Sequence, residues 1–361
     1  MALATAGWFF IFDHTALEDA SHPIRSSLLF VWLFGVILWA SAGVVRHAEG
    51  LAARLGEPYG TLILTLSVIG IEIFIVAMVM LAGENNPTLA RDTMFSVVMI
   101  VLNGLVGLAL LLGGLRHHEQ QYNLQGTNAY LSAIIVLGVL GLVLPSYTKA
   151  GAGPAFALPQ ELFLIAISFG LYLFFLLIQT TRHRAYFLSP QSEQAAGDAM
   201  DGGDQHHGVA VGSVPFHTLL LMAYLALVIF LAEKLAVLLN VGLDVLHAPP
   251  ALGGLLVAIL VLCPEGMSGI RAALANQMQR SVNILLGSAL STLALTIPAV
   301  LVIGLITHRP VVLGVESADQ TMLLLSLLLS VITFGGGRTN ILQGAVHLIL
   351  FLAFLMLVLR S

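Results

Sequence analysis

The sequence predicts an all-α polytopic membrane protein of about ten transmembrane helices, arranged as two inverted five-helix repeats. Of its 361 residues, 58% are hydrophobic and 9% are charged, whereas a soluble domain carries about 25% charged residues. The apolar residues form runs long enough for membrane helices, which need about 20 residues each. These runs lack the alternation of an outer-membrane barrel. Together with a single cysteine and a net charge of -5, they exclude a soluble enzyme, a nucleic-acid-binding protein and a disulfide-rich secreted domain.

Gaps between charged residues delimit the predicted helices. In the first half, residues 26–181, the five gaps run from Arg25 to Arg46, Glu57 to Glu84, Asp92 to Arg116, Glu119 to Lys149 and Glu161 to Arg182. In the second half, residues 214–361, the predicted spans cover about 216–239, 251–270, 282–306, 320–337 and 340–359.

Two segments lie outside these spans. Residues 1–25 begin with an apolar stretch that is too short to cross a membrane, and it has no basic region typical of a signal peptide. We interpret this segment as the remnant of an additional helix, with an interfacial anchor or a start-site artefact as alternatives. Residues 182–213 are rich in Gly, Asp, Gln and His, which predicts a solvated linker. A pH or metal sensor built on His206 and His207 is the alternative function for this linker.

The number of helices in each half sets the topology. Because five is odd, the second half enters the membrane from the opposite side, which makes the two halves inverted repeats. Loops after odd-numbered spans hold eight Lys and Arg residues, against five on the other side. This bias predicts that the linker between the halves is cytoplasmic.

Two acidic residues interrupt the apolar runs at equivalent places. Glu72 lies 12 residues after Gly60, and Glu265 lies 13 residues after Leu252. At a rise of about 1.5 Å per residue, both fall roughly 18–20 Å into a hydrocarbon core about 30 Å thick. Ionisable groups at this depth are costly and usually face a protein interior or a wet cavity. The matched positions predict that both glutamates meet at the midplane.

Two carboxylates at one place can bind either a cation or protons. Their four oxygens suit a hard cation, and without a counter-ion they cannot both stay ionised. Pro264 removes a helical hydrogen bond beside Glu265, which leaves a backbone carbonyl for an ion. The alternative is that each glutamate is protonated and hydrogen-bonded in a packed bundle. The matched positions of the two acids favour the cation site.

Four segments carry a resemblance to a known family. They are RHAEGLAARLGEPYGTLILTLSVIGIE (46–72), PTLARDTMFSVVMIV (87–101), PEGMSGIRAALANQMQRSVNILLGSALSTLALTIPAVL (264–301) and GRTNILQGAVHL (337–348). The sequence resembles the ChaA-type calcium/proton and sodium/proton antiporters of the calcium/cation antiporter superfamily. The resemblance implies an inverted five-plus-five core, cation export driven by protons, and Glu72 and Glu265 as shared ligands. Where the superfamily has Gly-Asn ahead of the acid, this chain has Val68-Ile69 and Val261-Leu262.

Polar residues in the next helix of each half are secondary candidates. Asn103 and Thr292 fall at equivalent places in that helix. They complete the cation coordination or form interhelical hydrogen bonds, and the sequence favours neither interpretation. Nearby candidates are Ser96, Ser288 and Ser291.

The sequence therefore predicts a secondary active antiporter, not an enzyme, that exports Ca²⁺, Na⁺ or K⁺ in exchange for protons. A passive cation channel is the alternative, but channels usually assemble their filters from several subunits. A membrane scaffold would leave the matched acids unexplained. The expected partners are membrane lipid, inorganic cations and protons. We expect no cofactor and no nucleic acid.

Overall fold

A computed structural model describes residues 4–8, 23–55, 59–82, 88–148, 156–188, 213–245 and 248–359. Within these ranges the chain is almost entirely helical, and strand pairing is limited to an isolated bridge between Gln121 and Arg338. In the described part, nine helices are long and apolar enough to cross a membrane. The predicted all-α polytopic fold is confirmed. Most of the N-terminal segment, and the linker positions that include His206 and His207, lie outside the described residues.

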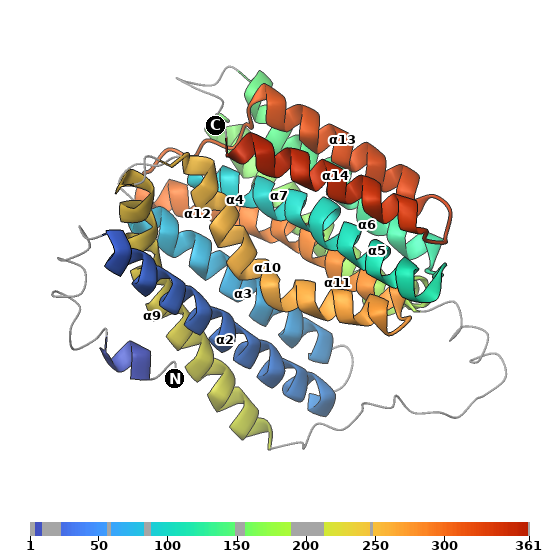
Figure 1. The fold of residues 1–361 in the computed structure, drawn as a ribbon, viewed down its shortest axis with the longest axis horizontal. Coiled ribbons are helices and arrows are strands. Elements are labelled where there is room, and N and C mark those ends of the chain that lie inside the picture. The colour runs from blue at the N-terminus through green and yellow to red at the C-terminus, as the bar shows by residue number, and fades with distance from the viewer. Residues whose placement is uncertain are drawn as a thin grey trace. The chain divides into compact units, whose positions relative to one another are not determined.

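The helices follow the predicted spans in order, as Figure 1 shows. The first half contains α2 (Pro23–Leu55), α3 (Tyr59–Ala82), the continuous run α4–η1–α5 (Leu89–Met99, Ile100–Leu105, Val106–His117), α6 (Leu124–Gly138) with η2 (Val139–Val143) and η3 (Leu144–Tyr147), and α7 (Leu158–Leu177) with η4 (Ile178–Arg182) and η5 (Arg184–Phe187). The second half contains α9 (Val214–Val245), α10 (Pro250–Leu274), the continuous run α11–η6–α12 (Met278–Ser291, Thr292–Thr296, Ile297–Thr307), α13 (Ser317–Phe334) and α14 (Ile341–Val358). α2 extends past Arg46, because a charged residue ends the apolar stretch without ending the helix.

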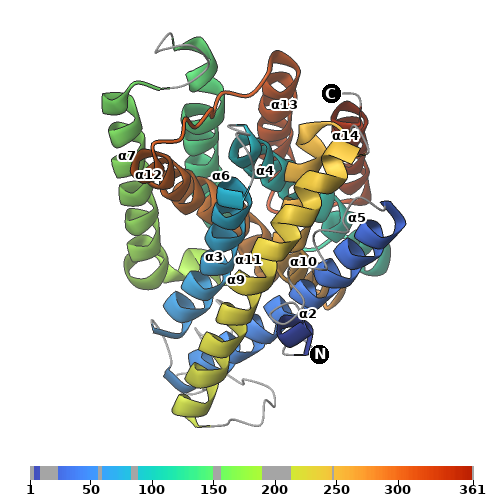
Figure 2. The same cartoon turned by 90° about the vertical axis from the view of Figure 1, so that its left-hand side faces the viewer.

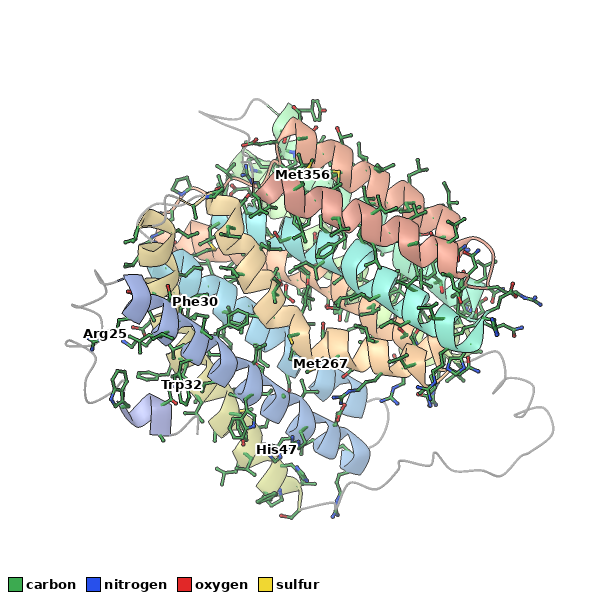
Figure 3. The ribbon with its side chains drawn as sticks, in the orientation of Figure 1. Arg25, Phe30, Trp32, His47, Met267 and Met356 are labelled. Atoms are coloured by element: carbon green, nitrogen blue, oxygen red, sulfur yellow. The ribbon has the colours of Figure 1, made fainter. Side chains whose placement is uncertain are left out.

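The chain divides into two compact units, and the first contains α2, α3, α9 and α10 as far as Pro264. α2, α3 and α9 pack side by side (Figures 1 and 2). Gly50 of α2 permits a close approach, since a Cβ there would lie 2.7 Å from Cε1 of His217 on α9. His47, towards the C-terminal end of α2 in Figure 3, has its Nδ1 3.0 Å from Nδ1 of His217. The first helices of the two halves are therefore joined by a partly buried polar contact.

The second unit contains α4–η1–α5, α6, α7, α10 from Glu265, α11–η6–α12, α13 and α14. Its packing is reciprocal between the halves. The run α4–η1–α5 packs against α13 and α14, and Figure 1 shows α5 beside α14. In the same way, α11–η6–α12 packs against α6 and α7. The third helix of each half thus lies against the fourth and fifth helices of the other, as expected for two equivalent repeats.

Both third helices contain a π-helical segment at corresponding positions. The segment η1 contains Asn103, and η6 begins at Thr292. π-Helical turns are uncommon and occur frequently at functional sites. The two polar residues singled out in the sequence therefore lie where the helices depart from regular α geometry.

Candidate cation site

Glu265 lies on α10 directly after Pro264, a proline inside the helix. Its carboxylate accepts a hydrogen bond from Oγ of Ser288 on α11. Proline has no N–H, so α10 lacks one backbone hydrogen bond beside this carboxylate. The contact joins two of the predicted site residues, and both belong to the second unit.

Gly266 brings η1 close to the same stretch of α10. A Cβ at this position would lie 2.8 Å from Cδ2 of Leu105 in η1. A side chain at residue 266 would therefore require the Leu105 side chain to move. The glycine permits this close approach of the segment that contains Asn103.

Two further predicted residues lie close to Ser288 along its helix. Ser291 and Thr292 are buried, and Ser291 Oγ donates a hydrogen bond to the backbone oxygen of Ser288 at 2.9 Å. The hydroxyl of Ser291 thus bonds to the helix backbone, whereas the hydroxyl of Ser288 bonds to a carboxylate. Ser288 is consequently the stronger candidate for a direct role in the site.

Asn103 forms interhelical hydrogen bonds. It is fully buried, and its Nδ2 lies 2.8 Å from Oγ of Ser326 on α13. Its Oδ1 lies 3.3 Å from Nδ1 of His347 on α14. Ser96 is buried on the same run of helix. These contacts are interhelical hydrogen bonds, one of the two roles that the sequence left open for Asn103, and a part in cation coordination stays a prediction.

Glu72 is buried within α3 of the first unit, at 3% exposure. Burial of an ionisable side chain in an apolar helix fits the predicted role of this residue. Its convergence with Glu265 stays a prediction based on the sequence repeat.

The sequence did not indicate a functional role for the polar residues around Asn103. Ser326, Ser330 and Thr333 are buried and lie on one side of α13, and Thr333 Oγ1 is 2.9 Å from Nε2 of His347. Their helical spacing within an apolar span was a usable signal, because it places all three on one face. His347 is fully buried between them and Asn103.

A polar cavity of about 330 Å³ opens where α4 and α13 begin and η3 ends, and Arg91, Ser146, Glu316 and Gln320 are among its lining residues. Arg91 pairs with Asp92, with Nε 2.7 Å from Oδ1, and donates to the Gly314 oxygen at 3.1 Å. The guanidinium is thereby held at the wall of the cavity.

In the short connection between α5 and α6, burial raises the pKa of Tyr122 to about 12, so its hydroxyl is protonated at neutral pH.

The described residues contain no cluster of three or more His, Cys, Asp or Glu side chains suited to a resident metal. The ligands that Glu265 and Ser288 offer are oxygen atoms. Such atoms are the ligands that hard cations prefer.

Family comparison assigns the chain to known transporters. The family model for sodium/calcium exchanger proteins matches residues 25–181 and 216–360. The chain belongs to the sodium/calcium exchanger family. The sodium-potassium/proton antiporter ChaA of Escherichia coli is 41% identical over 335 residues, which cover 92% of this exchanger and 89% of that protein.

More distant relatives agree with this assignment. The Ca²⁺/H⁺ antiporter ChaA of Bacillus subtilis is 22% identical over 89% of this chain and 88% of its own. The solved structure of the Ca²⁺/H⁺ antiporter protein YfkE has a TM-score of 0.69 at 19% identity. That match covers 98% of this chain and 99% of the YfkE chain. The exchanger therefore shares the fold of a solved antiporter along almost its whole length.

Proposed function

We propose that this exchanger exports Na⁺, K⁺ or Ca²⁺ from the bacterial cytoplasm in exchange for protons, and that Glu265 is a shared ligand for the cation and the proton. The contact between Glu265 and Ser288 within two membrane helices carries the proposal. The names of the relatives support proton-coupled exchange of these cations, because they include a sodium-potassium/proton antiporter and a Ca²⁺/H⁺ antiporter.

The chemistry of exchange follows from a carboxylate that binds one ligand at a time. When ionised, Glu265 and the hydroxyl oxygen of Ser288 offer hard ligands to a cation. When a proton binds the carboxylate, its negative charge is lost and the cation is released. Each cation that leaves is therefore replaced by protons, which couples the two fluxes.

Glu72 is proposed as the second carboxylate of the cycle. Support comes from its burial in α3 and from its place in the first repeat, equivalent to that of Glu265. Two interacting carboxylates titrate as a unit rather than as separate groups. Their combined charge suits a divalent ion or a monovalent ion together with a proton.

The proposed setting is the inner membrane, with the linker between the two halves in the cytoplasm. The excess of Lys and Arg in loops after odd-numbered spans supports this orientation. Neither a prosthetic group nor a resident metal is needed, because the transported cation and the protons are the only small ligands in the cycle.

The substitutions Glu265→Gln and Glu72→Gln test the proposal. Gln keeps the side-chain volume and one oxygen but removes the charge and the titration. We expect each variant to fold and to lose cation-dependent proton movement in everted membrane vesicles, assayed with Na⁺, K⁺ and Ca²⁺ in turn. Wild-type exchange in the folded Glu265→Gln variant would remove this residue from the mechanism.

The pH dependence separates exchange from a channel. Since protons and the cation compete for one carboxylate, the apparent cation affinity of the purified protein should weaken as pH falls. Cation flux that neither moves protons nor responds to a proton gradient would instead support the channel alternative. Constant cation affinity between about pH 6 and 9 would contradict a shared site, because protons would then leave cation binding unchanged over the range in which the exchange is assayed.

A further inference from the structure

The strongest unassigned feature is a buried chain of hydrogen bonds that crosses η1, α13 and α14. Asn103 lies at its centre, with Ser326 on one side and His347 on the other. Thr333 contacts the far side of the His347 ring, with Oγ1 2.9 Å from Nε2. Asn103, Ser326 and His347 are fully buried, and Thr333 is 2% exposed. None of these side chains is acidic, which makes the chain a polar structure separate from the carboxylate of Glu265.

The partners of Ser326 determine which way the Asn103 amide points. The Ser326 hydroxyl donates its hydrogen to the backbone oxygen of Met322, 2.7 Å away. It must therefore accept the hydrogen bond from the Asn103 side chain, which places the Asn103 NH₂ group towards α13. The amide oxygen of Asn103 consequently points towards His347 on α14.

The same reasoning determines the tautomer of His347. An amide oxygen only accepts hydrogen bonds, so Nδ1 of His347 must carry the hydrogen that faces Asn103. Nε2 of the neutral ring then carries the lone pair, and Thr333 donates its hydroxyl hydrogen to it. The contacts with Asn103 and Thr333 are both satisfied by this arrangement, and the backbone oxygen of Leu102 also accepts a hydrogen bond from the His347 ring.

The hydrogen-bonded side chains are connected to the candidate site through η1, the segment that contains Asn103. Leu105, two residues after Asn103, packs where Gly266 leaves space next to Glu265. η1 also packs against α11, the helix that carries Ser288. The orientation of the Asn103 amide is therefore set within a segment that borders the residues proposed to bind the cation.

We propose that His347 is a positioning residue that holds the Asn103 oxygen against α14 and thereby sets the ion specificity of the exchanger. This inference rests on the proposed function, because it assumes that η1 borders the cation path. Ca²⁺ takes six to eight oxygen ligands. An amide oxygen held by a histidine N–H is withheld from the cation, and this favours a monovalent ion over Ca²⁺.

Two substitutions at position 347 separate this role from simple packing. His347→Asn places an amide N–H donor near the position of Nδ1, so it keeps the bond to Asn103. His347→Gln places its amide near the position of Nε2, so it removes the donor that faces Asn103. Thr333→Val is the matched control. It removes the hydrogen bond on the other side of the His347 ring and keeps the bond between the ring and Asn103.

The measurement is the ratio of the KM values for Ca²⁺ and Na⁺, together with kcat, from proton-coupled flux in everted vesicles. We expect His347→Gln to lower the Ca²⁺ to Na⁺ KM ratio several-fold with little change in kcat. His347→Asn and Thr333→Val should keep the wild-type ratio. If His347→Gln does not fold, Ser326→Ala loosens the same amide from its other side and should shift the ratio in the same direction.

The proposal is overturned if His347→Gln keeps the wild-type ratio, or if His347→Asn shifts it equally. Glu265→Gln is assayed in parallel to keep the two proposals distinguishable. Loss of exchange in Glu265→Gln with an unchanged ratio in His347→Gln overturns only the role of His347. Persistent exchange in Glu265→Gln overturns only the role of Glu265 in the proposed function.

Discussion

At the scale of single residues, the contact between Glu265 and Ser288 explains how an acid is accommodated in a membrane helix. A charged side chain away from water is costly unless hydrogen bonds or an ion compensate it. The Ser288 hydroxyl supplies one such bond from the neighbouring helix. In the proposed cycle, other lone pairs of the carboxylate bind a cation or a proton.

Ser288→Ala should weaken cation binding without unfolding the protein. The substitution removes the hydroxyl oxygen that is proposed as a cation ligand, so the cation KM should rise roughly tenfold, which corresponds to about 1.4 kcal/mol. Ser291→Ala is the control, because the Ser291 hydroxyl bonds to a backbone oxygen one turn away. Vesicle flux at several cation concentrations gives both KM values. A larger effect in Ser291→Ala than in Ser288→Ala would contradict the direct role of Ser288.

The sequence indicated candidate site residues more readily than the contacts between them. Glu265 was identified from its depth in an apolar run and Ser288 from its place near Thr292, but their contact depends on how α10 lies against α11. Asn103 and Thr292 were equivalent in sequence, yet Asn103 binds to Ser326 and His347 in helices that lie far away along the chain. Hydropathy reports the depth of a residue in the membrane and not the identity of its neighbours.

At the scale of helices, the spans were predictable and their irregularities were not. Long apolar runs bounded by charged residues locate a transmembrane helix, because a helix must be long and apolar to cross the hydrocarbon core. The π-helical segments η1 and η6 have no comparable signature, since Ile100–Leu105 and Thr292–Thr296 share no residue pattern. A π turn adds one residue to a turn, and packing against neighbouring helices decides where it forms.

Pro264→Ala should stabilise α10 and slow exchange. Alanine restores the missing backbone hydrogen bond and is up to about 3 kcal/mol more favourable than proline in a helix interior. We expect a higher Tm in detergent and a lower kcat, with the cation KM close to that of the wild type. Gly254→Ala, at another position in α10, is the control for a general gain in helicity. A Pro264→Ala variant with wild-type kcat would show that the irregularity in α10 is not used during turnover.

At the scale of the whole molecule, the compact units differ from the two halves of the sequence. The first unit combines helices from both halves, and so does the second. Sequence reasoning locates repeats because they are continuous in the chain, whereas compact units depend on contacts between distant segments. The reciprocal packing of α4–η1–α5 and α11–η6–α12 shows how each half completes the other.

Removal of residues 190–208 should leave exchange intact. These residues lie between the two segments that the family model matches, and their composition is that of a solvated linker. We expect normal membrane insertion and a wild-type kcat and KM in vesicles. Replacement of the same residues by a Gly/Ser linker of equal length controls for the shortened connection. Loss of transport in both variants, with normal insertion, would assign a function to this segment.

The boundary between the two compact units falls between Pro264 and Glu265, within one continuous helix. Pro264 removes a backbone hydrogen bond from α10, and Glu265, the residue proposed to bind the proton, comes next along the chain. In the proposed cycle, a change in the charge of Glu265 therefore takes place directly beside the interruption in the backbone of its own helix. In that cycle no relay of intervening side chains is needed between proton binding and the irregular turn.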